Sequence, residues 1–412
     1  MLVFDLAIYA KAQEIRWNDP SLVKRTAIRL GEFHTAKSFL AIIGKRFRDA
    51  GRFDMFGESG LVAHGSVNAV MDGKQCNRAV YAHKLMYEGL QRLRFESFLD
   101  NVRDDVKMKA FLAHCIETFP SACFKNLCES DEMKEICNRY DQYVSECSSV
   151  QPTFKFWSTY IDMVALLQFV RATRECDWNM HLNAVRAMLP WFYAHDAQNY
   201  ARYLPAYWTE MLALPETHAE IYENVVVTGS WAVQQQDKYA FSATAADQTI
   251  EQTINRDCKT SGGLNGITLN RSAVARWVLS QSQRAAIAQQ CETLAGVNVD
   301  ARKRKDLDIS ARKRDEQAIS SIINCVRQMV NPFSLGSSNL HCISSGILAG
   351  EQVRDDLLNA WSRGEEMFRT FFENRISDKK VSLFDPMKKA KLCTFSSWTL
   401  QNHPVTTALR GR

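Results

Sequence analysis

The segments Leu2–Asp5 (LVFD) and Thr26–Phe47 (TAIRLGEFHTAKSFLAIIGKRF) decide the fold that the sequence predicts. Each opens with a short run of apolar residues, which is typical of a strand. Leu6–Ile15 follows the first run and Phe33–Phe47 the second, both with apolar residues at helical spacing. The order strand, helix, strand, helix is that of an α/β unit. We therefore expect a small α/β part in the first 49 residues.

Polar side chains stand just after both predicted strands. Asp5 ends the first run, and His34 lies just past the second. Because the carboxyl ends of neighbouring parallel strands meet at one edge, where α/β folds place their sites, both residues are candidates for a catalytic site. His34 fits equally well as a residue at a helix terminus that is hydrogen-bonded to the backbone.

A second polar concentration is Asp247–Gly266, which reads DQTIEQTINRDCKTSGGLNG. Asp247 and Glu251 are four residues apart, so they share one face of a helix. Ile250 and Ile254 lie beside that face and would anchor the helix to a core. Carboxylates beside a buried stripe suit metal-assisted chemistry. The alternative is a solvated surface, because charged helix faces usually meet water.

The composition indicates an ordinary globular protein. The chain has 412 residues, of which 46% are hydrophobic and 24% charged, with a net charge of +5 that permits a nucleic-acid partner. The first ten residues lack the features of a secretory signal, and no run of about 18 apolar residues occurs. We expect a soluble protein of the nucleus or cytoplasm that is neither secreted nor bound to a membrane.

Cysteine usage indicates free thiols. The chain has 12 cysteines and no C-x-x-C pair. The segment His114–Cys147 contains a histidine and several cysteines, but it lacks the close pairs of a zinc site. Free, mostly buried thiols in a reducing compartment are the better interpretation.

Four segments are predicted along the chain: the first part of an α/β core (1–49), a helical insertion (50–223), a return to the core with the acidic helix (224–300) and a basic helical region (301–412). Within them, Phe154–Arg174 and Ser272–Ala295 each read as one long helix. Asn224–Thr228 (NVVVT) reads as a strand, and Trp231–Val233 would return as a hairpin. Pro190 and Pro205 are expected to kink or divide helices.

Two basic clusters lie in the last segment. They favour a solvated helix face with internal ion pairs, with a nuclear-import or phosphate-contacting patch as the alternative. Their residues are Arg302, Lys303, Arg304, Lys305, Arg312, Lys313 and Arg314.

Five motifs carry a resemblance to a known group. They read FDLAIYAKA (Phe4–Ala12), RLGEFHT (Arg29–Thr35), ARYLPAYWTEM (Ala201–Met211), FSATAADQTIEQTIN (Phe241–Asn255) and NPFSLGSSNLHCISSGILAG (Asn331–Gly350). The chain resembles uncharacterised, multi-copy, transposon-like proteins of invertebrate genomes. More distantly it is similar to hAT-type transposases of the ribonuclease-H fold.

The resemblance implies a mostly helical protein with a truncated ribonuclease-H-like core and a large all-helical insertion. It implies that Asp5 and Glu251 are Mg²⁺ ligands, that Asp247 is a nearby or substitute carboxylate, and that His34 is a positioning group. The basic clusters would contact DNA phosphates. Two Mg²⁺ ions bridged by such carboxylates activate water or a 3′-hydroxyl for strand cleavage and transfer.

One departure limits this expectation. Transposases of this kind carry a first aspartate on an earlier strand, and no strand–Asp unit precedes Asp5. We therefore expect a fragment that is inactive by itself and that needs a first carboxylate from an upstream part or from another protomer of a homo-oligomer. The alternative is a non-catalytic, helical protein that binds nucleic acid or protein. A third alternative is an enzyme of another class. The sequence offers no motif for it, since it contains no P-loop, no G-x-G-x-x-G after a strand, no G-x-S-x-G and no H-E-x-x-H.

Overall fold

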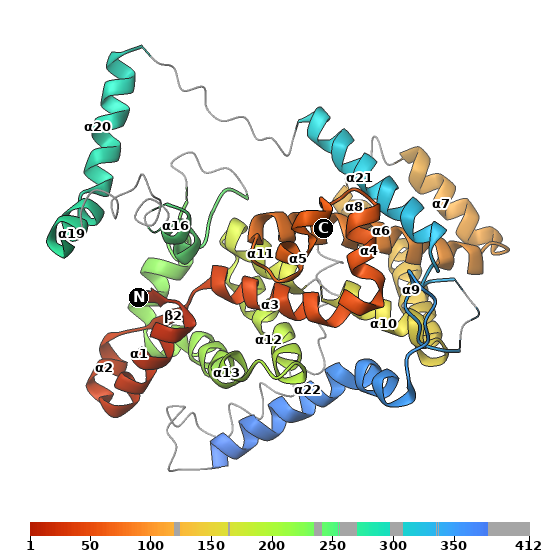
Figure 1. Cartoon of the computed structure of the whole chain (residues 1–412), viewed down its shortest axis with the longest axis horizontal. Coiled ribbons are helices and arrows are strands. Elements are labelled where there is room, and N and C mark those ends of the chain that lie inside the picture. Colours follow the sequence, from red (N-terminus) through yellow and green to blue (C-terminus); the bar gives the residue numbers. More distant parts are fainter. Residues whose placement is uncertain are drawn as a thin grey trace.

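The structure is a computed structural model that describes residues 1–118, 124–163, 165–234, 241–253, 255, 270–296, 308–334, 336 and 338–377. It is mostly helical with one small two-stranded sheet (Figure 1). The predicted fold class is confirmed at this level, a helical protein with a small α/β part.

The sheet pairs β1 (Leu2–Phe4) with β2 (Ile28–Leu30) in parallel, with Val3 opposite Arg29. Helices α1 (Leu6–Asn18) and α2 (Pro20–Arg25) connect the strands, and α3 (Glu32–Phe47) follows β2. The predicted order strand, helix, strand, helix is confirmed. The pairing continues past β1, where the Gly31 N–H donates to the Phe4 carbonyl at 2.7 Å.

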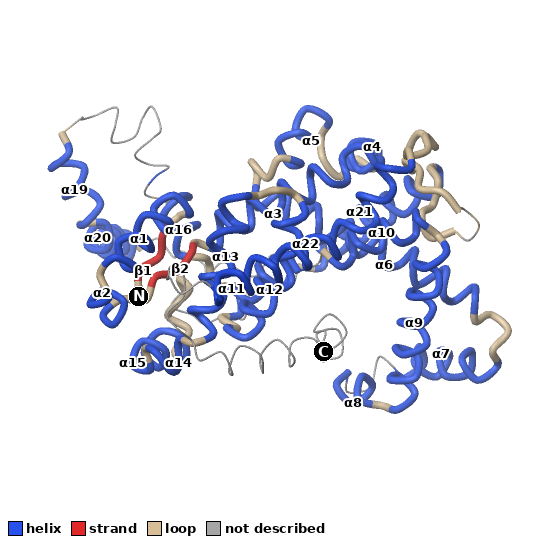
Figure 2. The backbone as a smooth tube through the Cα atoms, turned by 90° about the horizontal axis from the view of Figure 1, so that it is seen from below, coloured by secondary structure: helices blue, strands red, loops and turns tan. Residues whose placement is uncertain are grey.

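A helical body surrounds α3, as Figures 1 and 2 show from two sides. Its apolar side chains form one continuous buried cluster that draws on all four predicted segments, from Tyr9 to Phe368. The segment boundaries themselves stay a prediction. The helices are α4 (Phe53–Glu58), α5 (His64–Met71), α6 (Cys76–Asn101), α7 (Val106–Thr118), α8 (Phe124–Glu129), α9 (Asp131–Val150), α10 (Pro152–Asp162), α11 (Ala165–Glu175), α12 (Trp178–Ala194), α13 (Gln198–Leu212), α14 (Leu214–Thr217), α15 (Ala219–Ile221), α16 (Ala246–Gln252), α19 (Arg271–Leu279), α20 (Gln281–Leu294), α21 (Ile309–Gln328) and α22 (Glu351–Ser377).

Two long helices of the sequence analysis are each divided in the structure. The segment predicted as one helix from Phe154 is broken at Met163 into α10 and α11. The break lets the two halves face different partners, since α10 packs on α9 and α11 on α12 and α3. Pro190 and Pro205, which were expected to kink or divide helices, lie inside the assigned spans of α12 and α13.

The strand predicted at Asn224–Thr228 is wrong. Asn224–Val227 belong to a π-helix, Tyr222–Val227, that continues from α15, and Thr228 follows its last residue. Val226 is buried but Val227 is 61% exposed, so the valine run lacks the apolar cover that a central strand needs. The predicted hairpin is also wrong, because Val233 forms its antiparallel bridge with Thr244 instead.

The segment predicted as one helix from Ser272 is also divided, into α19 and α20, which meet at Ser280. Neither helix has a buried residue. Trp277 is 40% exposed, Ile287 59% and Leu294 88%, so these apolar residues form no buried side. No helix among the described residues is long and apolar enough to cross a membrane.

Candidate functional site

The two predicted sites meet at the carboxyl ends of β1 and β2. The chain returns to this edge through residues 241–245, where Thr244 pairs with Val233 and the Ala243 N–H donates to the Arg174 carbonyl at 3.3 Å. Helix α16 starts one residue later and packs on both α3 and β1. Residues more than 200 positions apart in the sequence therefore share one site.

Asp247 is the centre of this contact. One carboxylate oxygen accepts from the Phe33 N–H at 3.1 Å, and the other accepts from the His34 N–H at 3.2 Å. The same oxygen lies 3.1 Å from His34 Nδ1. Asp247 thereby caps the first turn of α3, whose unpaired N–H groups and dipole favour a negative charge. The residue is only 7% exposed, so the solvated alternative is wrong for Asp247.

Gly31 makes this close approach feasible. A Cβ atom at Gly31 would stand 2.3 Å from Asp247 Oδ2, which is far inside contact distance. Since the φ of Gly31 is −65°, its backbone conformation suits any residue. The glycine is therefore required for space and not for backbone freedom.

Glu251 lies one turn further along α16, 4.0 Å from His34 Nε2. Asn255 donates to its carboxylate at 3.0 Å. Asp247 and Glu251 both face His34, which confirms that they share one face of the helix. Glu251 is more open than Asp247, with a side chain 32% exposed. The predicted anchor Ile250 is wrong, because it is 47% exposed and Asp247 docks the helix instead; Ile254 lies outside the described residues.

Asp5 lies at the same edge but stands apart from this trio. Its carboxylate accepts from the Ile8 N–H at 2.9 Å and caps α1. Among the described residues, no hydrogen bond or ion pair joins it to Asp247, Glu251 or His34. The structure thus brings together three of the four predicted catalytic residues, and we name His34, Asp247 and Glu251 the acidic cluster. Their catalytic roles stay a prediction.

A buried ion pair lies beside the acidic cluster. Arg29 of β2 pairs with Glu32 of α3, and both are almost inaccessible. The Arg29 guanidinium also donates to the Trp231 carbonyl at 2.6 Å and lies 5.0 Å from the centre of the Trp231 ring. Burial lowers the pKa of Arg29, although the Tyr207 hydroxyl and the charge of Asp247 oppose that shift.

The electrostatics of the edge follow from these carboxylates. The hydrogen bond to Asp247 raises the pKa of His34, and the nearby charge of Glu251 adds to the effect. Burial raises the pKa of Tyr200 to about 12, with smaller contributions from the charges of Asp247 and Asp5. The edge therefore favours cations and protonated groups.

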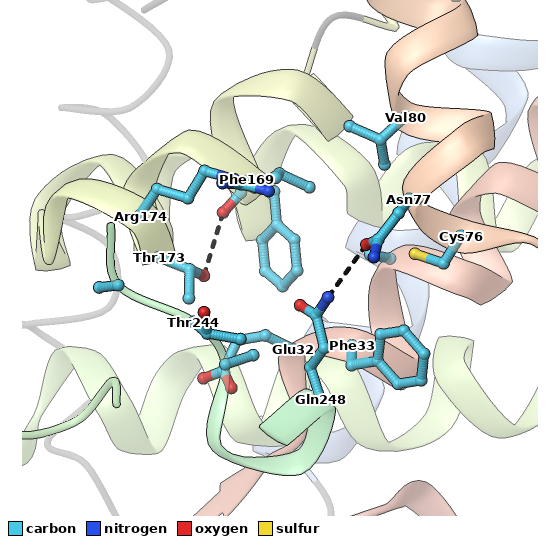
Figure 3. Close-up of a pocket in the computed structure, with 14 residues that line it drawn as sticks. Glu32, Phe33, Cys76, Asn77, Val80, Phe169, Thr173, Arg174, Thr244 and Gln248 are labelled. Carbon is cyan, nitrogen blue, oxygen red and sulfur yellow. Dashed lines mark hydrogen bonds between the residues drawn. The ribbon is translucent and has the colours of Figure 1, made fainter. Parts of the chain in front are cut away.

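A pocket of about 70 Å³ opens beside the cluster (Figure 3). Glu32, Phe33 and Gln248, which flank the cluster residues in sequence, form part of its wall. The Gln248 side chain donates to Asn77 Oδ1 at 3.0 Å, and this hydrogen bond connects α16 to the start of α6. The ring of Phe169 closes another side.

The carboxylate oxygens of Asp5, Asp247 and Glu251 are the donors that Mg²⁺ prefers. In the described part of the chain, however, no three His, Cys, Asp or Glu side chains converge closely enough to hold a metal ion. The predicted Mg²⁺ ligands Asp5 and Glu251 therefore stay a prediction.

The cysteine-containing segment His114–Cys147 was not favoured as a zinc site. Its described residues are among those in which no three such side chains could hold a metal ion. Of the nine cysteines described as free thiols, Cys76, Cys147 and Cys325 are buried, so "mostly buried" was wrong.

The two basic clusters have different outcomes. Arg302, Lys303, Arg304 and Lys305 lie outside the described residues. Arg312, Lys313 and Arg314 lie exposed in the first turns of α21, as expected of a solvated face. The expected ion pairs are not found for Lys313 and Arg314 among the described residues. Their neighbour Asp315 accepts from the Tyr81 hydroxyl of α6. Phosphate contact by these residues stays a prediction.

Sequence reasoning missed the residues that hold the cluster in place. Gly31, Arg29 and Glu32 all stand in the motif RLGEFHT. One signal was available: an arginine inside an apolar strand must be paired if the strand is buried, and Glu32 is three residues away. Nothing in the sequence alone indicated that Trp231 would cover Arg29.

No curated protein and no solved structure matches the chain significantly. A family model does match it, over residues 1–406, and its description is "Domain of unknown function (DUF8702)". Since this match includes both strands, the acidic cluster and the helical body, the chain belongs to the DUF8702 family.

Proposed function

We propose that this chain is a transposase-like protein whose acidic cluster takes part in Mg²⁺-dependent chemistry on nucleic-acid phosphodiesters. One observation carries the proposal. Helix α16 brings Asp247 and Glu251 to the carboxyl edge of a parallel strand pair, where both face the same histidine of α3. That edge is where open α/β sheets place their sites.

The arrangement also fits the truncated ribonuclease-H-like core that we propose for residues 1–49 and α16. Asp5 directly follows β1, while α16 packs against β1 and α3 after a long helical segment. Carboxylates that are distant in sequence thus come to one edge, as a metal-dependent phosphoryl-transfer site requires. In this proposal a further carboxylate comes from elsewhere, so strand cleavage is not expected of this chain alone.

The oxygen donors suit Mg²⁺ by their chemistry, and the chain's own residues would supply part of its ligand set, since no three of them converge into a complete site in the described part of the chain. Glu251 is the most open carboxylate of the cluster and would be the first ligand. Asp247 would share its oxygens between the metal and the N–H groups of α3. His34 holds α16 against α3 through its ring nitrogens. A bound metal would polarise the phosphodiester and stabilise its leaving oxygen.

Metal binding tests the proposal without requiring activity. Mn²⁺, which substitutes for Mg²⁺ and is visible by electron paramagnetic resonance, would be titrated into the full chain. We expect one saturable Mn²⁺ site. Its affinity should fall at least about tenfold in Glu251→Gln, which corresponds to a loss of about 1.4 kcal/mol in binding free energy. Glu366→Gln, an exposed carboxamide exchange on α22, is the matched control. Equal binding by both variants would overturn the metal assignment.

One observation favours the alternative, a non-catalytic binding protein. Helices α19 and α20 present Leu279 and Ile287 to solvent, and apolar side chains exposed in this way are common at binding surfaces. Under this alternative the chain binds nucleic acid or protein, and Mn²⁺ neither binds at Glu251 nor changes that binding. The same titration therefore separates the two functions.

A further inference from the structure

Two hydrogen bonds connect the acidic cluster to the basic end of α21 by way of α6. Gln248 of α16 donates to Asn77 in the first turn of α6 at 3.0 Å. One turn later, the Tyr81 hydroxyl donates to Asp315 of α21 at 2.5 Å. The first contact is drawn in Figure 3. The start of α6 thus forms a bridge between the cluster and the first turns of α21.

Helices α6 and α21 run parallel, so their amino-terminal turns lie together. Three successive contacts show this direction. Tyr81 meets Asp315, a Cβ at Gly89 would stand 3.1 Å from Ile322, and Arg327 pairs with Glu96 at 2.8 Å. The exposed basic residues at the start of α21 therefore lie near the start of α6, next to the pocket.

Four exposed cations line this junction, and we name them the cationic patch: Arg78 and Lys84 of α6, with Lys313 and Arg314 of α21. The hydrogen bonds of Arg78 within the described part of the chain go to neutral oxygens, those of Gln75 and Ser66. Lys84 is two turns after Asn77 and shares its helix face. In the described part of the chain, none of the four forms an ion pair with a carboxylate.

Hydrogen bonds and ion pairs hold the carboxylates beside the patch. Asp315 accepts from Tyr81, and Arg92 holds both Glu316 and Glu88. The four cations of the patch together with Arg92 outnumber these three carboxylates and Asp308, so the formal charge of this group is positive. A positive surface that begins beside a strand-end carboxylate cluster is complementary to a phosphate backbone passing from one to the other.

We propose that the cationic patch binds the backbone of duplex DNA and guides it from α21 along α6 to the acidic cluster. This inference rests on the proposed function, since it takes the cluster's substrate to be DNA. It adds Arg78 and Lys84, which touch no part of the cluster, as phosphate-contacting residues. Such contacts position a duplex without reading its sequence.

The test is fluorescence anisotropy of a labelled duplex with the full chain, in EDTA and at several salt concentrations. We expect Arg78→Gln/Lys84→Gln to weaken binding about tenfold or more at 0.1 M salt. The slope of log K against log salt should fall in magnitude by roughly 1–2, because each lost phosphate contact removes about 0.9. A second variant, Lys313→Gln/Arg314→Gln, should act in the same direction.

Lys24→Gln/Arg25→Gln is the matched control. It removes the same two charges from exposed positions of α2, which leads into the amino end of β2 and so lies at the opposite edge. We expect it to leave the affinity within about twofold. An equal loss in both variants, no loss in the α6 variant, or no DNA binding at low salt would each overturn the inference.

The result is independent of the metal titration. DNA binding in EDTA does not involve Mg²⁺. If the patch variants bind DNA normally while Mn²⁺ binding is intact, only this inference is rejected. A functional patch without Mn²⁺ binding rejects the metal-dependent function and leaves a DNA-binding protein.

Discussion

At the scale of single residues, Asp247 connects the two halves of the site. Its carboxylate accepts from two backbone N–H groups of α3 and from His34, and these contacts dock α16. A capping carboxylate contributes about 0.5–2 kcal/mol, and a negative charge at a helix amino terminus adds some tenths more. The site and the packing of α16 therefore depend on the same side chain.

Gly31→Ala should reveal this dependence. The added methyl group would meet Asp247 Oδ2, so we expect a loss of about 1–3 kcal/mol in the free energy of unfolding. In an Asp247→Ala background the obstructing oxygens are gone, and the same change should cost at least about 1 kcal/mol less. Urea denaturation of the four proteins in the cycle measures this coupling. Additive losses would show that Gly31 is needed for another reason.

His34 predicts a pH dependence. Its pKa is raised, mainly by the hydrogen bond to Asp247 and further by Glu251, while burial and Lys37 oppose the shift. A raised folded-state pKa stabilises the protein below the unfolded pKa of about 6.5, and this contribution disappears as the pH rises through the folded value. The advantage of the wild type over His34→Gln should therefore shrink between about pH 6 and 8.5.

Because the His34 ring is 28% exposed, solvent screens this interaction, and we expect a change below about 1 kcal/mol. Urea denaturation of both proteins at the two pH values measures it. An advantage that grows with pH would mean that His34 is neutral in the folded protein.

At the scale of elements, α12 and α22 pack closely against each other. Gly364 lies against the Pro190 carbonyl, where a Cβ would stand 2.0 Å from the oxygen. Beside it, Arg186 of α12 donates to Glu365 of α22 at 2.6 Å, and Glu365 is 6% exposed. Burial opposes ionisation of Glu365, but the hydrogen bonds and charges of Arg186 and Arg369 lower its pKa.

Gly364→Ala should separate these helices. We expect a loss of about 2 kcal/mol or more, since backbone atoms of Pro190 obstruct the methyl group and cannot rotate away. Gly65→Ala in α5 is the control. A Cβ there meets nothing within 4 Å, so that change should be neutral or stabilise the helix by up to about 1 kcal/mol. Similar urea midpoints for the two variants would contradict the close contact.

Elements could be predicted where the local sequence pattern determines the secondary structure. They could not be predicted where contacts with distant parts of the chain determine it. Strand, helix, strand, helix follows from the apolar spacing of residues 1–47, and Asp5 and His34 were placed at the correct edge for that reason. The valine run Asn224–Thr228 has strand propensity, yet Asn224–Val227 are helical, and no strand among the described residues pairs with them. The break at Met163 depends on which helices its two sides contact.

At the scale of the whole molecule, the site could be predicted in part. A four-residue spacing placed Asp247 and Glu251 on one face, and the resemblance brought that face to the strand ends. The unequal burial of the two carboxylates could not be read from spacing, because it depends on the missing Cβ of Gly31, more than 200 positions away. Arg29 was missed for the same reason, as its cover comes from Trp231.

The packing of α22 on α12 also has a consequence for how the protein is made. During synthesis α12 leaves the ribosome roughly 180 residues before α22 is complete, which takes about 10–40 s at ordinary translation rates. Throughout that interval the buried face of α12 and the Arg186 guanidinium lack their partners on α22. The nascent chain therefore presents an open apolar surface to its surroundings, and a chaperone that shields it would raise the yield of folded protein.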